Sequence, residues 1–244
     1  MRDADDLCHP IYRALGWAVH GYTASGAMLG LLAIEFSATG RFRAAFVAMA
    51  LATVIDSSDG PLARGLRLQQ LIPQFDGALL DNLVDYLTYV IAPVFLMLRA
   101  QLMPVGWAGW LLATAVVISS AFGFSRVNAK TADNYFLGFP SYWNLVAFYL
   151  YCFAFSRTIN AVIMLVLVAL VWVPSKYIYP NRTLRLRRLT LILAALWAVL
   201  VAIILFELPH PKPLLVWCSF GFIGYYLVMS CIFSIQGRRA LVPP

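Results

Sequence analysis

Long apolar runs, separated by short charged or Pro/Gly-containing breaks, are the feature that most restricts how this chain can fold. A helix needs about 20 predominantly apolar residues to cross the hydrocarbon layer of a bilayer. We predict eight such spans, near 21–38, 42–60, 77–98, 106–125, 142–156, 159–174, 189–206 and 214–235. Because 62% of the residues are hydrophobic and only 12% are charged, too little polar sequence remains to cover a soluble core. The sequence therefore predicts an all-α, polytopic integral membrane protein, with residues 1–244 forming a single membrane-embedded domain.

The N-terminal segment does not resemble a secretory signal, since its charges are mixed and no apolar stretch follows at once. We predict that residues 1–19 form a cytoplasmic helix at the membrane interface, with Ile11, Leu15 and Trp17 toward lipid. The four cysteines and three histidines are scattered along the chain and form no recognisable metal-binding spacing.

The net charge of +7 invites a nucleic-acid interpretation, but the distribution of the basic residues favours another. If the N-terminus faces the cytoplasm, the eight predicted spans place all but five of the eighteen Lys and Arg residues on the cytoplasmic side. The exceptions are Arg41, Arg43, Arg99, Arg157 and Lys212. Such a bias is typical of membrane proteins and sets their orientation. It accounts for the basic charge without a nucleic-acid partner.

Acidic residues gather in one stretch, residues 56–85, between two apolar runs. Asp56 and Asp59 are three residues apart at the end of the second predicted span. Asp81 and Asp85 are four residues apart near the start of the third. Both spacings place two residues on one face of a helix. We therefore expect two helices to present four carboxylates toward each other.

The excess negative charge of this stretch predicts bound cations. Only Arg64 and Arg67 are basic within residues 56–85, and unpaired carboxylates at a membrane are costly. A site of oxygen ligands suits Mg²⁺ or Mn²⁺ rather than Zn²⁺, and two such ions can clamp a phosphoryl group. Gly60 and Gly77 leave room for a nucleotide to approach the backbone. On spacing alone, a proton or cation pathway is an alternative use for the same carboxylates.

The stretch resembles the signature of the CDP-alcohol phosphotransferase family: Asp56-x-x-Asp59-Gly60-x-x-Ala63-Arg64, then Gly77-x-x-x-Asp81-x-x-x-Asp85. The gap between Arg64 and Gly77 holds twelve residues, more than in most of the family. With the larger number of spans and the segment Lys130–Asn144, this longer gap resembles the bacterial phosphatidylcholine synthase branch. The inserted residues include Pro73 and are predicted to form a loop or broken helix over the site.

The resemblance implies a reaction in which the hydroxyl of choline attacks the lipid-side phosphorus of CDP-diacylglycerol, giving phosphatidylcholine and CMP. It implies two divalent ions, Mn²⁺ or Mg²⁺, held by Asp56, Asp59, Asp81 and Asp85. Asp85 would also be the general base that accepts the hydroxyl proton. The CDP-binding residues implied are Asp59, Gly60, Ala63, Arg64, Gly77 and Thr23, the last from the first-span pattern His20-x-x-Thr23, where the family often has Asn-x-x-Thr. The resemblance further implies a bacterial inner membrane, a cytoplasmic active site, contact with membrane lipids and a homodimer.

Choline carries a trimethylammonium group without an N–H donor, which aromatic faces and a carboxylate hold well. Aromatic residues make up 14% of the chain, and most are expected at the membrane interface. The aromatic candidates near the predicted cytoplasmic site are Tyr22, Tyr86, Tyr89, Tyr135, Phe136, Phe139, Tyr142 and Trp143. Asn144 could orient the acceptor hydroxyl.

Two alternatives to choline transfer fit parts of the sequence. The same chemistry with serine, inositol or glycerol phosphate would use the same signature, although glycerol phosphate would need a basic acceptor pocket. A cation transporter would need a polar path through the bilayer. Outside residues 56–85, the acidic residues in or near the spans are Glu35 and Glu207, both toward the far side. No continuous polar path is visible, so a phosphotransferase is favoured over a transporter, and the resemblance to the phosphatidylcholine synthase branch implies choline as its acceptor.

Overall fold

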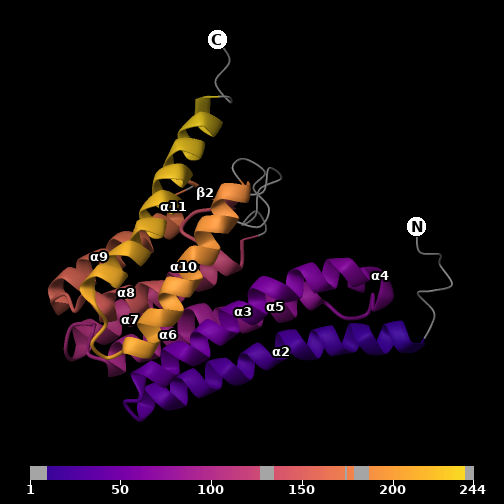
Figure 1. Cartoon of the computed structure of the whole chain (residues 1–244), viewed down its shortest axis with the longest axis horizontal. Coiled ribbons are helices and arrows are strands. Elements are labelled where there is room, and N and C mark those ends of the chain that lie inside the picture. Colours follow the sequence, from indigo (N-terminus) through magenta and orange to yellow (C-terminus); the bar gives the residue numbers. More distant parts are fainter. Residues whose placement is uncertain (1–9, 127–134, 174, 179–186, 240–244) are drawn as a thin grey trace. The chain divides into compact units, whose positions relative to one another are not determined.

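The computed structural model describes residues 10–126, 135–173, 175–178 and 187–239. The chain divides into two compact units, Met1–Arg99 and Ala100–Pro244. Both units are built mainly from helices, as the composition predicts (Figure 1).

Two long helices, α2 (Pro10–Ala38) and α3 (Phe42–Leu66), run side by side in the first unit (Figure 1). They are followed by the short α4 (Leu68–Leu71) and by one continuous helical stretch, Gly77–Arg99. This stretch consists of α5 (Gly77–Asp85), the π-helix η1 (Tyr86–Ile91) and α6 (Ala92–Arg99). Helix α2 contacts all of these elements and is the centre of the unit.

Helix α2 can contact so many neighbours because its buried face is lined by small residues. A Cβ at Gly26 would lie 2.7 Å from Val84, and one at Gly30 would lie 2.9 Å from Leu87. Small residues at such positions let helix backbones approach closely in membrane proteins. The buried positions of α2 recur every three or four residues: Gly16, His20, Thr23, Gly26, Gly30, Ala33 and Ser37.

The structure has no break between the predicted interfacial helix at 1–19 and the predicted first span at 21–38, because α2 runs unbroken from Pro10 to Ala38. The position of its first turns at the membrane interface stays a prediction. Residues 1–9 lie outside the described residues. The first turns of α2 are packed rather than independent, since a Cβ at Gly16 would lie 2.8 Å from the Ile72 side chain. The three side chains predicted to face lipid are exposed: Ile11, Leu15 and Trp17.

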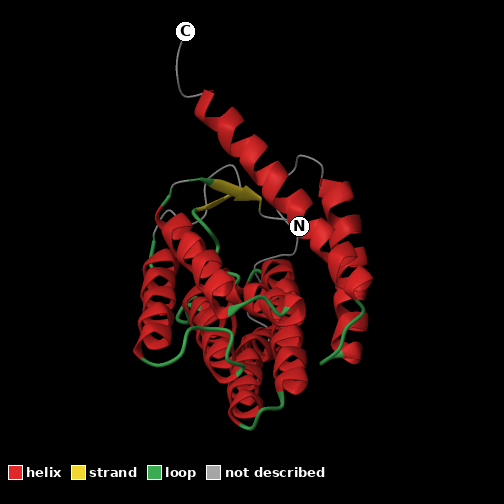
Figure 2. Ribbon diagram, turned by 90° about the vertical axis from the view of Figure 1, so that its left-hand side faces the viewer, coloured by secondary structure: helices red, strands yellow, loops and turns green. Residues whose placement is uncertain are grey.

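The second unit contains five helices among its described residues: α7 (Trp107–Phe124), α8 (Trp143–Phe153), α9 (Arg157–Trp172), α10 (Arg187–Glu207) and α11 (Pro213–Arg239). Helix α7 packs against α9, and α11 packs against α8 and α10. Strands β1 (Tyr135–Leu137) and β2 (Lys176–Ile178) pair antiparallel, as Figure 2 shows in yellow. The all-helical prediction misses this sheet, because strands of three residues are too short to reveal an alternating pattern.

Each predicted span coincides with a helical stretch of the structure. Four of these stretches are long and apolar enough to cross a membrane: Gly77–Arg99, Trp107–Phe124, Arg188–Glu207 and Pro213–Ile232. Helices α8 and α9 are apolar but shorter. The described part of the chain therefore has the character of an integral membrane protein, while the count of eight spans stays a prediction.

Candidate active site

Three carboxylates from two helices converge in the first unit. Asp56 lies on α3, Asp81 and Asp85 lie on α5, and one carboxylate oxygen of each lies within 4.8 Å of the others. All three side chains are half-buried. Oxygen ligands at such separations fit a hard divalent cation such as Mg²⁺ or Mn²⁺. We call Asp56, Asp81 and Asp85 the acidic cluster.

Asp59 has a different environment from the acidic cluster. Its side chain is only 5% exposed, and its Oδ2 accepts a 2.8 Å hydrogen bond from Thr23 Oγ1 on α2. The backbone of Gly60 also hydrogen bonds to this carboxylate, and Arg64 lies close enough to interact with it electrostatically. Three residues turn an α-helix by about 300°. Asp59 therefore points about 60° away from Asp56 and meets α2, so its role as a metal ligand stays a prediction.

Asp76 sets the start of the helix that carries Asp81 and Asp85. Its Oδ1 accepts a 2.9 Å hydrogen bond from the backbone N–H of Leu79, which makes it the N-cap of α5. An acidic N-cap satisfies a free backbone donor and interacts favourably with the helix dipole. Asp76 is exposed, and an aspartate directly before the glycine that begins a helix is a signal for this cap in the sequence.

The π-helix η1 begins directly after Asp85 and brings Tyr89 to the acidic cluster. Tyr89 is only 6% exposed, and its hydroxyl donates a 2.7 Å hydrogen bond to Oδ2 of Asp56. Short π-helical segments inside α-helices occur frequently at functional sites. The sequence placed Tyr89 among the choline-binding candidates because it lies one turn after Asp85. The structure instead places its hydroxyl on a signature carboxylate.

The two signature glycines both lie against side chains of this chain. A Cβ at Gly77 would lie 2.7 Å from Cε1 of His20, and one at Gly60 would lie 3.1 Å from a terminal nitrogen of Arg64. His20 is 7% exposed, packs against Phe75 at 4.5 Å between ring centroids, and finds no hydrogen-bond partner for Nε2 among the described residues. The sequence analysis expected a nucleotide beside Gly60 and Gly77. In the structure, side-chain atoms of Arg64 and His20 lie beside these two glycines.

The inserted residues between Arg64 and Gly77 fold into a turn and α4, in line with the predicted broken helix. Arg67 ends α3 in the left-handed region, with φ 53° and ψ 47°. Three side chains around α4 then form a buried cluster: Leu68, Leu71 and Ile72. The partly buried side chains that pack against it are Tyr12, Val19, Ala63, Leu66 and Phe75. Signature residue Ala63 therefore contacts the insertion, and Arg64 beside it is exposed.

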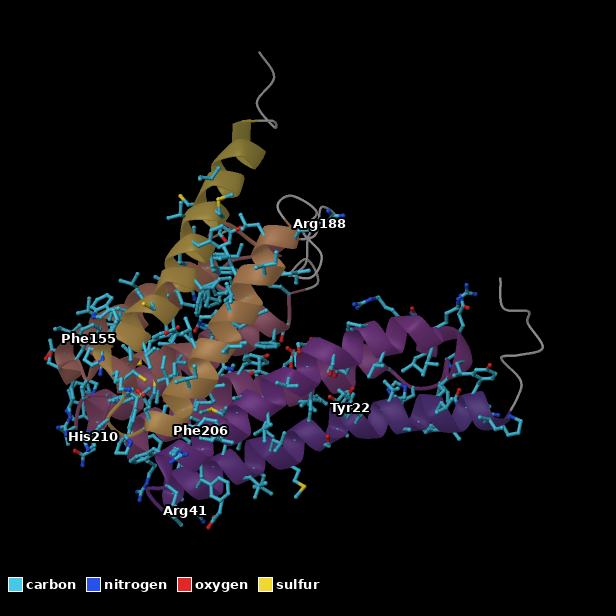
Figure 3. The ribbon with its side chains drawn as sticks, in the orientation of Figure 1. Tyr22, Arg41, Phe155, Arg188, Phe206 and His210 are labelled. Carbon is cyan, nitrogen blue, oxygen red and sulfur yellow. The ribbon has the colours of Figure 1, made fainter. Side chains whose placement is uncertain are left out.

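The choline-binding candidates of the first unit lie close to signature positions in the chain. The hydroxyl of Tyr22 lies 2.8 Å from Oγ of Ser58, so this ring points from α2 toward α3 (Figure 3). Tyr86 is half-buried and is the first residue of η1, directly after Asp85.

The candidates of the second unit are mostly packed. Trp143 is fully buried, and its indole N–H donates a 2.8 Å hydrogen bond to Ser120. Asn144 is buried, and its side-chain oxygen accepts a hydrogen bond from the backbone N–H of Leu145. Tyr142 is half-buried at the start of α8. The backbone of Tyr135 belongs to β1, while its side chain and the whole of Lys130 lie outside the described residues.

Comparisons with known proteins find similarity over most of the chain, including the signature residues. A sequence profile for CDP-alcohol phosphatidyltransferase matches residues 22–222. The chain is 38% identical over 221 residues to the phosphatidylcholine synthase of Legionella pneumophila, covering 88% of this chain and 86% of that protein. It is 36% identical over 219 residues to the phosphatidylcholine synthase of Pseudomonas aeruginosa, covering 89% and 91%. The chain belongs to the CDP-alcohol phosphatidyltransferase family, as its signature predicts.

Proposed function

We propose that this chain synthesises phosphatidylcholine by transferring the phosphatidyl group of CDP-diacylglycerol to choline, with release of CMP. The observation that carries the proposal is the acidic cluster, in which carboxylates from α3 and α5 converge within 4.8 Å. Family membership supports the transfer reaction. Relatives named phosphatidylcholine synthase, with identities from 34% to 40%, support choline as the acceptor.

Asp56, Asp81 and Asp85 hold divalent ions, Mn²⁺ or Mg²⁺, because their oxygens match the ligand type and spacing that these ions need. Asp59 joins them when two ions are bound. Bound ions neutralise charge on the pyrophosphate of the donor. Without them, the three half-buried carboxylates would repel one another and the donor.

Asp85 accepts the proton of the choline hydroxyl as the hydroxyl oxygen attacks the lipid-side phosphorus. The new oxygen–phosphorus bond forms as the bond to CMP breaks, so CMP leaves with the bonding electrons. A general base must lie within hydrogen-bond reach of the proton that it takes. The position of Asp85 at the end of α5, half-buried in the acidic cluster, suits this role.

The CDP moiety binds beside the acidic cluster, along α3 and the start of α5. Arg64 is exposed on α3, so its guanidinium is free to turn toward a phosphate, for which its planar fork is well suited. Thr23 holds Asp59 in place from α2. The full set of CDP-binding residues is Thr23, Asp59, Gly60, Ala63, Arg64 and Gly77.

Tyr22 and Tyr86 contribute aromatic faces for the choline trimethylammonium group, since both belong to the unit that carries the acidic cluster. The candidates from the second unit are Tyr135, Tyr142, Trp143 and Asn144. The protein works as one membrane-embedded domain in a bacterial inner membrane, as a homodimer whose active site faces the cytoplasm. The bias in the basic residues and the four long apolar helices support this placement.

The acceptor is tested with purified protein, CDP-diacylglycerol and Mn²⁺, with choline, serine, inositol or glycerol phosphate in separate reactions. CMP release with choline alone supports the proposal. Release with one of the other alcohols but not with choline would retain the transfer chemistry and discard the acceptor. No release with any alcohol, in folded protein, would discard the phosphotransferase and favour cation transport.

A matched pair of variants tests the carboxylate chemistry in the same assay. Asp85→Asn and Glu207→Gln each remove one negative charge and keep the side-chain volume. Glu207 pairs with Lys212 at 3.4 Å in the second unit and has no role in the proposed site. We expect Asp85→Asn to abolish CMP release and Glu207→Gln to leave it unchanged.

A further inference from the structure

The geometry points to a positioning role for Tyr89: we propose that its hydroxyl holds the Asp56 carboxylate in the orientation that a divalent cation requires. This inference rests on the metal-binding part of the proposed function. It also removes Tyr89 from the aromatic residues that could surround choline. The argument depends on one buried hydrogen bond and on the elements that it connects.

The hydrogen bond between Tyr89 and Asp56 is short and shielded from solvent. The Tyr89 hydroxyl donates to Oδ2 of Asp56 over 2.7 Å, and the Tyr89 side chain is only 6% exposed. Thr53, almost one turn before Asp56 on α3, is a second side-chain partner of the same hydroxyl. Hydrogen bonds to a charged acceptor are stronger than neutral ones. The buried ring and the two hydrogen-bond partners restrict the movement of Tyr89. Its hydroxyl therefore restricts the orientation of the Asp56 carboxylate.

This hydrogen bond connects the two helices that share the acidic cluster. Asp81 and Asp85 lie on α5, which continues into η1 and therefore into Tyr89. Asp56 lies on α3 and is separated from Tyr89 by 33 residues of sequence. Tyr89 thus ties the helix with two carboxylates to the third carboxylate. Because an ionised carboxylate has about four lone-pair positions, Asp56 can accept this hydrogen bond and still bind a cation.

The π-helical form of η1 suits this role. Asp85 and Tyr89 are four residues apart, a spacing that places both on one face of a regular α-helix. In η1 the hydrogen bonds run from i to i+5, which widens the turn and changes the direction in which Tyr89 leaves the helix. The tyrosine then reaches Asp56 on α3, while Asp85 takes its place in the acidic cluster. Residues that orient metal ligands in this way commonly change metal affinity about 10- to 100-fold when mutated.

The test is a titration of the purified full chain with Mn²⁺ in detergent, without substrates, in which electron paramagnetic resonance measures free Mn²⁺. We expect Tyr89→Phe to raise the Kd for Mn²⁺ about 10- to 100-fold. Tyr149→Phe is the matched control, because Tyr149 is also a buried tyrosine whose hydroxyl hydrogen bonds to side chains, Ser219 and Trp197, in the second unit. It should leave the Kd unchanged. At saturating Mn²⁺, Tyr89→Phe should leave the KM for choline unchanged.

An unchanged Mn²⁺ Kd in folded Tyr89→Phe would overturn the inference, and a raised choline KM with unchanged Mn²⁺ affinity would return Tyr89 to a choline site. If Tyr89→Phe does not fold, Thr53→Val removes the second partner of the same hydroxyl, and an unchanged Kd in that variant also counts against the inference. Wild-type protein that binds Mn²⁺ but transfers nothing to choline would refute the proposed function and leave the role of Tyr89 intact. Wild-type protein that binds no Mn²⁺ would refute both.

Discussion

Gly77→Ala tests whether the signature glycine is needed for packing within the chain or for the nucleotide alone. The added Cβ would lie 2.7 Å from Cε1 and 3.3 Å from Nδ1 of His20, whereas ordinary contact begins at 3.4 Å. The difference, 3.4 minus 2.7, means that the ring or the start of α5 must move by about 0.7 Å. His20 cannot move cheaply, because it is buried and packs against Phe75 at 4.5 Å and Trp17 at 5.8 Å between ring centroids.

Overpacking of this kind costs roughly 1–3 kcal/mol. For a chain of this size, each kcal/mol lowers Tm by roughly 2–4 °C. Because α5 carries Asp81 and Asp85, we also expect Gly77→Ala to lower kcat for transfer to choline. Gly21→Ala is the matched control, since a Cβ there meets nothing within 4 Å. Thermal unfolding in detergent and the transfer assay measure the two effects.

A double-mutant cycle identifies the cause. If the overlap with His20 is responsible, His20→Ala combined with Gly77→Ala should be more stable than the sum of the two single effects predicts. An unchanged Tm for Gly77→Ala would refute the packing argument. If Tm were unchanged and only the KM for CDP-diacylglycerol rose, Gly77 would serve the nucleotide alone.

Three further variants separate structural from catalytic contributions. Asp76→Ala removes the N-cap of α5 and should cost about 0.5–2 kcal/mol, measured as a lower Tm in thermal unfolding, whereas an unchanged Tm would mean that the cap is not needed. Thr23→Val keeps the side-chain volume but loses a hydrogen bond to a charged group, worth about 1.5–3 kcal/mol. If that whole energy is expressed in donor binding, the KM for CDP-diacylglycerol rises on the order of 10- to 100-fold, and an unchanged KM would remove Thr23 from the donor site. Trp143→Phe deletes the indole N–H that donates to Ser120, so it should lower Tm; a raised KM for choline would support Trp143 as a choline-binding residue, and an unchanged KM would remove it from the candidates.

The helices and the acidic pairs could be predicted because each depends on local sequence pattern. Each of the eight apolar runs predicted as a span is helical in the structure. The four-residue spacing correctly placed Asp81 and Asp85 on one face of α5. The continuous α2 was missed, because the packing of Gly16 against Ile72 is a long-range contact that periodicity does not report.

The missed features of the site have a common physical origin. Asp59 was grouped with Asp56 because they are three residues apart, but whether such a pair faces one partner depends on which helices surround it. Here α2 supplies Thr23, whose hydroxyl donates a hydrogen bond to Asp59, a contact that the three-residue spacing does not reveal. The π-helix η1 carries no sequence signal that we recognise, so Tyr89 was assigned by α-helical spacing. Tertiary contacts, rather than local pattern, decide these positions.

The central claim is that this chain uses divalent ions at the acidic cluster to transfer a phosphatidyl group to choline. The most direct measurement incubates purified protein in detergent with CDP-diacylglycerol, labelled choline and Mn²⁺, with and without a chelator. We predict equal amounts of labelled phosphatidylcholine and CMP, loss of both with the chelator, and recovery when Mn²⁺ is restored. Labelled lipid that forms equally well in the presence of the chelator, or no labelled lipid from folded protein supplied with Mn²⁺, would contradict the claim.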